Sequence, residues 1–233
     1  MVVTMLTIVG TGHVFRIAEA VRFIVRQTWP DAVLVELDER RYNAMVHGVE
    51  NPSESGGGMY GSAARYQKDL AETQGSSVGA DMLAAVDEGK LIGADIGFID
   101  MDAAAVMEKL WEEMSMSEKM RYRLSSIRDG ILGPRRAEKV AMDFSDDPHR
   151  HMEDMRRKYP TLVKCLVDDR DDHMSGRIKE WMATHRNVLV VVGDAHVDGL
   201  LARLPGVGAK IIRLGDLMDP ERLGELKSEM WNQ

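Results

Sequence analysis

The chain of 233 residues holds a single cysteine, Cys165, so it cannot form an internal disulfide. This lack suits a reducing compartment, in which free thiols persist. Cys165 lies in the apolar stretch "TLVKCLV", and free cysteines are among the most buried residue types. We therefore expect Cys165 to pack as a small hydrophobic residue rather than to act as a catalytic thiol.

Long apolar runs and excess positive charge are also missing. No run reaches the ~18–20 residues that cross a bilayer, and "MVVTMLTIVG" lacks the basic segment of a signal peptide. The 38 acidic residues outnumber the 30 basic ones, which leaves a net charge of -8. An acidic balance provides no basic nucleic-acid footprint and disfavours polyanionic partners. The sequence thus predicts a cytoplasmic protein with no membrane span and no nucleic-acid partner.

What is present is an alternation of apolar runs and helical patterns. Helical patterns at 14–28 and 38–46 follow the first two apolar runs, and this order is typical of a parallel sheet covered by helices. Residues 102 to about 182 have the pattern of a helical insertion. We expect one α/β domain over 1–233, with a mostly parallel central sheet and flanking helices. The expected strands are 5–10, 32–37, 94–100, 188–193 and 209–215.

One motif occurs twice, near the two ends of the chain. An apolar strand runs into "GTGHV" at residues 10–14 and into "GDAHV" at residues 193–197, which place His13 and His196 three residues after a glycine. Glycine permits a sharp turn, and open parallel sheets bind ligands at the carboxyl ends of their strands. If the two strands are neighbours, His13 and His196 face one crevice. The alternative is that each histidine only caps a helix or binds backbone.

Glu36 ends the second expected strand, in "VLVELDER", and should lie at the same edge. Two histidines and a carboxylate, with one position left open, are typical of a catalytic zinc or similar divalent site. A metal held in this way polarises a carbonyl and lowers the pKa of bound water. Asp38, Asp100 and Asp102 could add oxygen ligands or a general base.

The first motif also matches two glycines of a dinucleotide fingerprint, and acids stand at 36 and 38, where a ribose-binding residue belongs. Phe15 replaces the third glycine, however, which normally permits close packing of helix on strand. A third segment, "VDDRDDHMSGRIKEWM", has the charge run of a solvated helix face. Arg170 lies between "CLV" and Met174 and could still point inward to bind a carboxylate or an oxyanion.

The order of the motifs resembles the TraB/PrgY family, which is related to the TIKI peptidases and more remotely to the erythromycin-esterase and ChaN group. The resemblance covers about residues 6–204 and rests on "GTGHV", "PDAVLVELDERR", "GADMLAA", "DMD", "DDRDDHM" and "VVVGDAHVDGL". It implies a TIKI-like α/β fold in which two GxxH elements line the cleft of a divalent-metal-dependent peptidase. By position, it implies that the site residues are His13, Glu36, Arg170 and His196.

Two positions depart from the pattern of that family. Asp169 stands where the family typically has glutamate, and Met101 stands where an arginine is often found between two acids. Many relatives also carry C-terminal membrane helices, which we do not expect in this chain. These departures motivate an alternative in which the same cleft binds or sequesters a peptide or small ligand without catalysis.

The leading hypothesis is a metal-dependent hydrolase, of the TraB/TIKI peptidase type, that acts on a peptide or small-molecule substrate. His13, Glu36 and His196 would hold Mn, Co or Zn, and either Glu36 or Asp169 would activate water. Arg170 would stabilise an oxyanion or lock that carboxylate in place. Sequestration is the alternative and nucleotide binding the third hypothesis, while the oligomeric state, including a homodimer, stays open.

Overall fold

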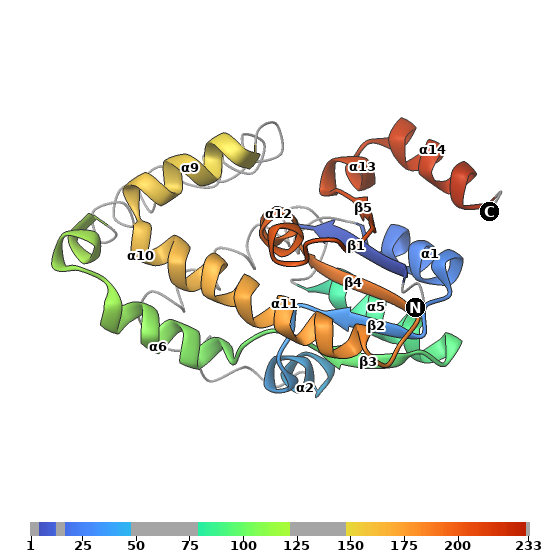
Figure 1. The fold of residues 1–233 in the computed structure, drawn as a ribbon, viewed down its shortest axis with the longest axis horizontal. Helices are drawn as coiled ribbons and strands as arrows, with labels where there is room; N and C mark the ends of the chain where they lie inside the picture. The colour runs from blue at the N-terminus through green and yellow to red at the C-terminus, as the bar shows by residue number, and fades with distance from the viewer. Residues whose placement is uncertain (1–4, 13–16, 48–78, 122–147, 232–233) are drawn as a thin grey trace.

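A computed structural model of the chain describes residues 5–12, 17–47, 79–121 and 148–231 (Figure 1). Its centre is a sheet of five strands in the order β3-β2-β4-β1-β5, and every pair of neighbours is parallel. This confirms the expected α/β class with a parallel sheet. The strands are β1 (Met5–Thr11), β2 (Ala32–Val35), β3 (Asp95–Phe98), β4 (Asn187–Gly193) and β5 (Ala209–Ile212).

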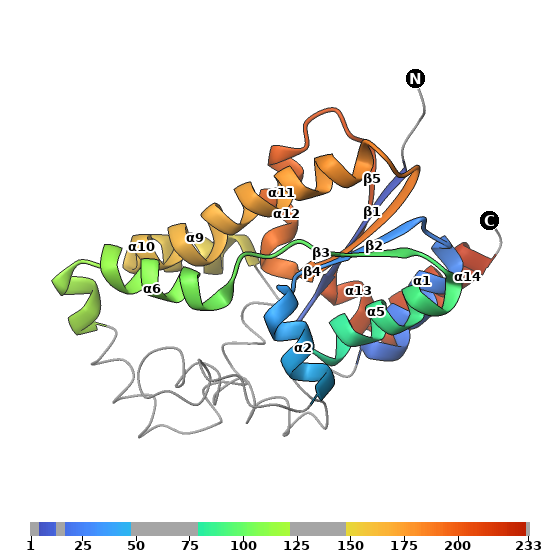
Figure 2. The same ribbon diagram turned by 90° about the horizontal axis from the view of Figure 1, so that it is seen from below.

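Helices cover both faces of the sheet, which is why the central strands read as continuous apolar runs. Alternate side chains of β4 show the division: Leu189 and Val191 pack with one set of helices, and Val190 and Val192 with the other. Figure 2 shows the strands between these two layers. One layer holds α1 (Ala18–Thr28), α5 (Ala80–Ile92), α13 (Leu214–Met218) and α14 (Pro220–Trp231), and the other holds α11 (Asp169–Met182) and α12 (Asp194–Arg203).

The strands that carry the two glycine motifs are neighbours, as the crevice hypothesis requires. Thr11 pairs with Gly193 at the carboxyl ends of β1 and β4. The chain leaves β1 and β2 toward helices on one face, and it leaves β4 toward α12 on the other. A point at which neighbouring strands connect to opposite faces is where open α/β sheets form a ligand crevice. The topology therefore places a candidate site at the carboxyl ends of β1, β2 and β4.

A helical arm lies between β3 and β4 in the chain and extends away from the sheet in both ribbon views (Figures 1 and 2). A small core of its own holds it together, in which Leu110 and Met114 pack against Cys165. Cys165 is buried, as its apolar setting predicts. In its described residues the arm consists of α6 (Ala103–Glu113), helical residues 116–121, α9 (Pro148–Lys158), α10 (Pro160–Val163) and a π-helical segment η1 (Lys164–Asp168), which leads into α11.

Some element boundaries differ from the sequence expectation. The last strand ends at Ile212 rather than at 215, because the backbone N–H of Leu214 donates to the Asp194 carboxylate at 2.9 Å and α13 begins there. The helix expected over 38–46 is α2 (Glu39–His47), whose first turn is capped by Asp38. Within the described ranges, none of the helices combines the length and apolarity that a membrane crossing requires.

Candidate functional site

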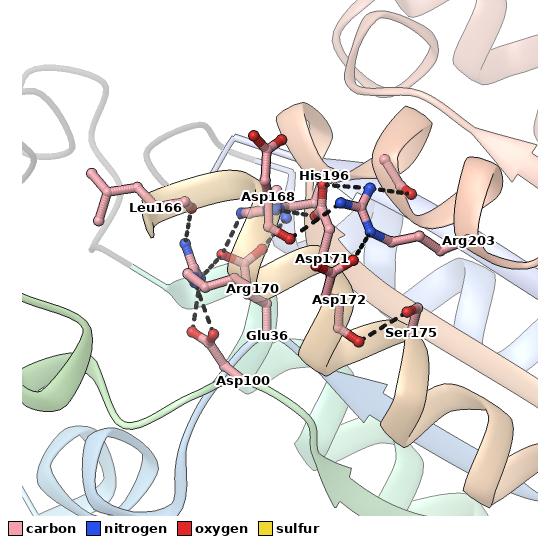
Figure 3. Close-up of polar contacts among 12 residues, drawn as sticks. Glu36, Asp100, Leu166, Asp168, Arg170, Asp171, Asp172, Ser175, His196 and Arg203 are labelled. Atoms are coloured by element: carbon pink, nitrogen blue, oxygen red, sulfur yellow. Dashed lines mark hydrogen bonds and ion pairs between the residues drawn. The ribbon is translucent and has the colours of Figure 1, made fainter. Parts of the chain in front are cut away.

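A cluster of buried charged side chains lies at the carboxyl edge of the sheet (Figure 3). Glu36 and Asp100 follow β2 and β3, and His196 lies in the first turn of α12. Arg170 and Asp171 reach the cluster from the first turn of α11, which crosses this edge. Four segments that are far apart in the sequence thus contribute to one site.

Glu36 stands at the centre of the cluster and is only 5 % exposed. Its backbone N–H donates to the Val191 carbonyl at 3.1 Å, which continues the ladder between β2 and β4 by one residue. Because strand side chains alternate, Glu36 points to the same face as Leu34, toward α11 and α12. There Oε2 accepts from the Gly193 N–H at 2.5 Å, and Oε1 lies 3.3 Å from Nε2 of His196.

His196 lies between two carboxylates. Its Nδ1 is 2.7 Å from Oδ1 of Asp171, while Nε2 faces Glu36. Burial lowers the pKa of His196, but the charge of Glu36 and the hydrogen bond to Asp171 outweigh burial and raise the pKa to about 9. With this pKa, the ring is an imidazolium at neutral pH.

Arg170 joins Glu36 to Asp100. Its Nε and Nη2 donate to the two Asp100 oxygens at 2.8 and 2.7 Å, the fork geometry that guanidinium and carboxylate favour. Nη2 also donates to Glu36, and Nη1 donates to the Leu166 carbonyl at 3.1 Å. Burial lowers the pKa of Arg170, but the charges of Glu36 and Asp100 outweigh burial and raise this pKa above its usual value. The guanidinium is therefore permanently charged.

The cluster is a row of alternating charges. Arg203 lies 3.8 Å from the far oxygen of Asp171, and Arg41 lies 3.3 Å from Asp100 at the other end. Each acid of the row thus lies between two bases, which offsets part of the cost of burying it. In order, the row is Arg203, Asp171, His196, Glu36, Arg170, Asp100 and Arg41.

The structure brings together three of the residues that the sequence singles out, Glu36, Arg170 and His196. His13 lies outside the described residues. Asp169 has different neighbours from the other site candidates: its Oδ2 is 2.7 Å from Nζ of Lys109 and 3.2 Å from Nζ of Lys164, both on the arm. These lysines lower the pKa of Asp169.

The three additional acids have separate roles. Asp100 holds Arg170, as described above. Asp38 caps α2 by accepting from the Arg41 N–H at 2.9 Å, and Asp102 caps α6 by accepting from the Ala105 N–H at 3.0 Å. Both are common N-cap arrangements, in which a side-chain oxygen satisfies a free helical N–H.

Sequence reasoning missed Asp171, which it counted among the residues of a solvated charge run. Asp171 is 1 % exposed and contacts His196 directly. A signal was present, because Asp171, Met174 and Ile178 follow the i, i+3, i+7 spacing of one helix face, and all three are buried. The acid stands at the end of the apolar stripe of α11 that faces the sheet.

The described side chains fit a metal ion in part. His196 Nε2 and Glu36 Oε1 face each other, and a carboxylate on Nδ1 is the usual outer partner of a metal-binding histidine. Within the described ranges, however, three His, Cys, Asp or Glu side chains nowhere converge in a group that could hold a metal ion. The third protein ligand that the sequence expects is His13.

Comparisons with known proteins agree with the family resemblance. A relative in Methanocaldococcus jannaschii, an uncharacterized protein, is 26 % identical over 208 residues, which cover 84 % of this chain and 52 % of the relative. The chain thus spans about half the length of that relative. The sequence model of the TraB/PrgY/gumN family matches residues 3–211, nearly the whole chain. The chain therefore belongs to the TraB/PrgY/gumN family.

Proposed function

We propose that this chain is a divalent-metal-dependent hydrolase of peptide bonds, in which His13, Glu36 and His196 hold Mn, Co or Zn. The observation that carries the proposal is the buried pair of His196 Nε2 and Glu36 Oε1, 3.3 Å apart at the crevice of a parallel sheet. Buried charged groups gathered at such a crevice are characteristic of active sites.

The bound metal would polarise the scissile carbonyl and acidify a water molecule. The residues of the chain perform the remaining tasks. Glu36 accepts the proton of the attacking water as its oxygen bonds to the carbonyl carbon, and the proton then passes to the leaving amine. Arg170, held in place by Asp100, keeps its positive charge beside Glu36. There this charge would stabilise the negative charge that develops on the carbonyl oxygen. We assign the base to Glu36 rather than to Asp169, because Glu36 lies beside His196 in the buried cluster, whereas Asp169 contacts two lysines of the arm.

Metal and proton compete for His196. The imidazole must be neutral to bind a metal, and its pKa of about 9 means that binding releases a proton at neutral pH. The proposal therefore predicts that metal affinity rises with pH up to about 9.

The direct test is the metal content of the purified full-length protein after dialysis against Mn, Co or Zn. We expect bound metal in wild type, and its loss in His13→Ala and in His196→Ala. His185→Ala is the matched control, because His185 contacts Asp95 and the Trp181 carbonyl at a different place. Unchanged metal content in both site variants would refute the metal site.

Turnover of a peptide library with added metal tests the reaction itself. Cleavage that disappears in His196→Ala and Glu36→Gln, but persists in His185→Ala, supports the hydrolase. Binding without cleavage would support the second candidate, a protein that sequesters a peptide or small ligand. One observation favours that candidate: the carboxylates of Glu36 and Asp100 are both already engaged by Arg170.

Nucleotide binding is the weakest candidate. A Cβ on Gly10 would lie 2.2 Å from Oδ1 of Asp194, so the glycine admits a carboxylate. A carboxylate beside the turn repels a pyrophosphate, which the turn would have to bind in a dinucleotide fold. A thermal shift with NAD or ATP would rescue this hypothesis, and a flat response would remove it.

A further inference from the structure

We infer that Asp171 is a positioning residue, whose carboxylate fixes the ring of His196 with the proton on Nδ1 and with Nε2 directed at Glu36. A second residue, Gly199, makes room for this carboxylate. Neither residue belongs to the sequence-derived set of metal or catalytic candidates.

The contacts of Asp171 define its task. Oδ1 lies 2.7 Å from Nδ1 of His196, and the aspartate side chain is almost completely buried. The two nitrogens of an imidazole are distinct, and the partner of one decides what the other can do. Since Asp171 accepts from Nδ1, only Nε2 remains to act on the Glu36 side of the ring (Figure 3).

Gly199 shows that α12 is shaped around this carboxylate. It lies three residues after His196, on the same face of α12. A Cβ at position 199 would lie 1.9 Å from Oδ2 of Asp171 and 2.7 Å from its Cγ, closer than atoms can approach. The glycine therefore permits α11 and α12 to pack at the distance at which Asp171 reaches the ring.

Arg203 completes the arrangement one turn further along α12. Its Nη1 donates to the Gly199 carbonyl at 3.0 Å and lies 3.8 Å from Oδ2 of Asp171. The two carboxylate oxygens are thus divided, one toward His196 and one toward Arg203. An acid buried only as a counterion for Arg203 would not need its other oxygen on the histidine.

The test is NMR of the full-length, metal-free protein with 15N-labelled histidine rings. We expect the Nδ1 proton of His196 to resonate far downfield and to exchange slowly with water, because it is buried and bound to a carboxylate. Asp171→Asn should move this signal upfield, since an amide is a weaker acceptor, and Asp171→Ala should abolish it. Asp172→Asn removes the same charge at the next, exposed position of α11 and should leave the signal unchanged.

A second set of variants tests the role of Gly199 and leaves both His196 and Asp171 in place. Gly199→Ala should weaken or abolish the same signal, although neither His196 nor Asp171 is altered. Gly176→Ala is the control, because a Cβ there meets no atom within 4 Å. Circular dichroism identifies variants that fail to fold. The NMR spectrum of wild type is a test that needs no variant: if it contains no slowly exchanging Nδ1 proton of His196, the inference is wrong. A signal that persists in folded Asp171→Ala would also overturn it.

The functional consequence rests on the proposed function, whereas the NMR readout does not. If the chain binds metal through His196, Asp171→Asn should weaken metal affinity about 10–100-fold, as the loss of outer partners of ligating histidines does. Failure of the hydrolase proposal would leave the Nδ1 signal in place. Failure of the positioning role would instead remove the signal from wild type or leave it unchanged in the Asp171 variants.

Discussion

Replacement of Arg170 by alanine should cost more stability than any exposed charge deletion in this chain. The guanidinium lies between Glu36 and Asp100 and donates to both, and all three side chains are buried or nearly so. Removing the guanidinium leaves the buried carboxylates of Glu36 and Asp100 without the cation that they share. Breaking a buried ion pair from one side typically costs about 3–5 kcal/mol.

The cost has an upper bound that follows from protonation. At pH 7, neutralising a carboxyl group of ordinary pKa, about 4, requires about 4 kcal/mol, so each orphaned acid can cost no more than that. In the variant the Gly193 N–H still donates to Glu36, and Arg41 still pairs with Asp100. We therefore expect a total loss of about 3–5 kcal/mol at pH 7 for Arg170→Ala, a large part of the stability of a typical domain.

Urea unfolding of wild type and variant at pH 7 measures this loss. Arg177→Ala is the matched control on the same helix, because among the described residues Arg177 pairs with exposed Glu180. Arg170→Lys should recover only part of the loss, since a lysine cannot form the two-pronged contact with Asp100. A loss below about 1 kcal/mol would refute this reasoning.

Three further predictions concern single positions. The pKa of His196 is raised to about 9, so the stabilisation from its charge is fully present below about pH 6.5 and is lost as pH rises through about 9. The free energy of unfolding in urea of wild type, relative to that of His196→Gln, should therefore fall by about 3 kcal/mol between these pH values. A difference that stays constant with pH would contradict this prediction. Gly10→Ala should destabilise by about 1–3 kcal/mol, because its Cβ would meet the buried Asp194 carboxylate, and Gly215→Ala, in open space, should leave the melting temperature nearly unchanged. Asp169→Asn should lose less than about 1 kcal/mol and retain any peptide cleavage, whereas loss of cleavage would return this residue to the catalytic set.

The sheet was predictable because its physics is local to each strand. The runs around Val33 and Val190 are apolar at every position, as strands buried on both faces must be. The motif of glycine and, three residues later, histidine at the ends of the first and fourth strands then predicted side chains at one edge of the sheet. β1 and β4 are neighbours, as that prediction requires, and the pairing of β2 with β4 places His196 beside Glu36.

The helix that crosses the edge was harder to read. Asp169, Arg170 and Asp171 are consecutive, yet they contact two lysines of the arm, two carboxylates and a histidine, respectively. Successive helical residues point about 100° apart, so the direction of each depends on how α11 is rotated over the sheet. The packing of Met174 and Ile178 against the sheet sets that rotation. Their apolar spacing is present in the sequence, but the many charged residues around it made the buried face of the helix hard to recognise.

The π-helical segment Lys164–Asp168 ties the length of the chain to the direction of Arg170. A π turn holds one residue more than an α turn, and such turns often occur beside functional sites. Deletion of one residue here would rotate everything before it by about 100° relative to α11. Either Cys165 would leave Leu110 and Met114, or Arg170 would leave Glu36. Substitutions in this segment are therefore easier to accommodate than changes of length, and a relative that lacks the extra residue should have repacked its arm.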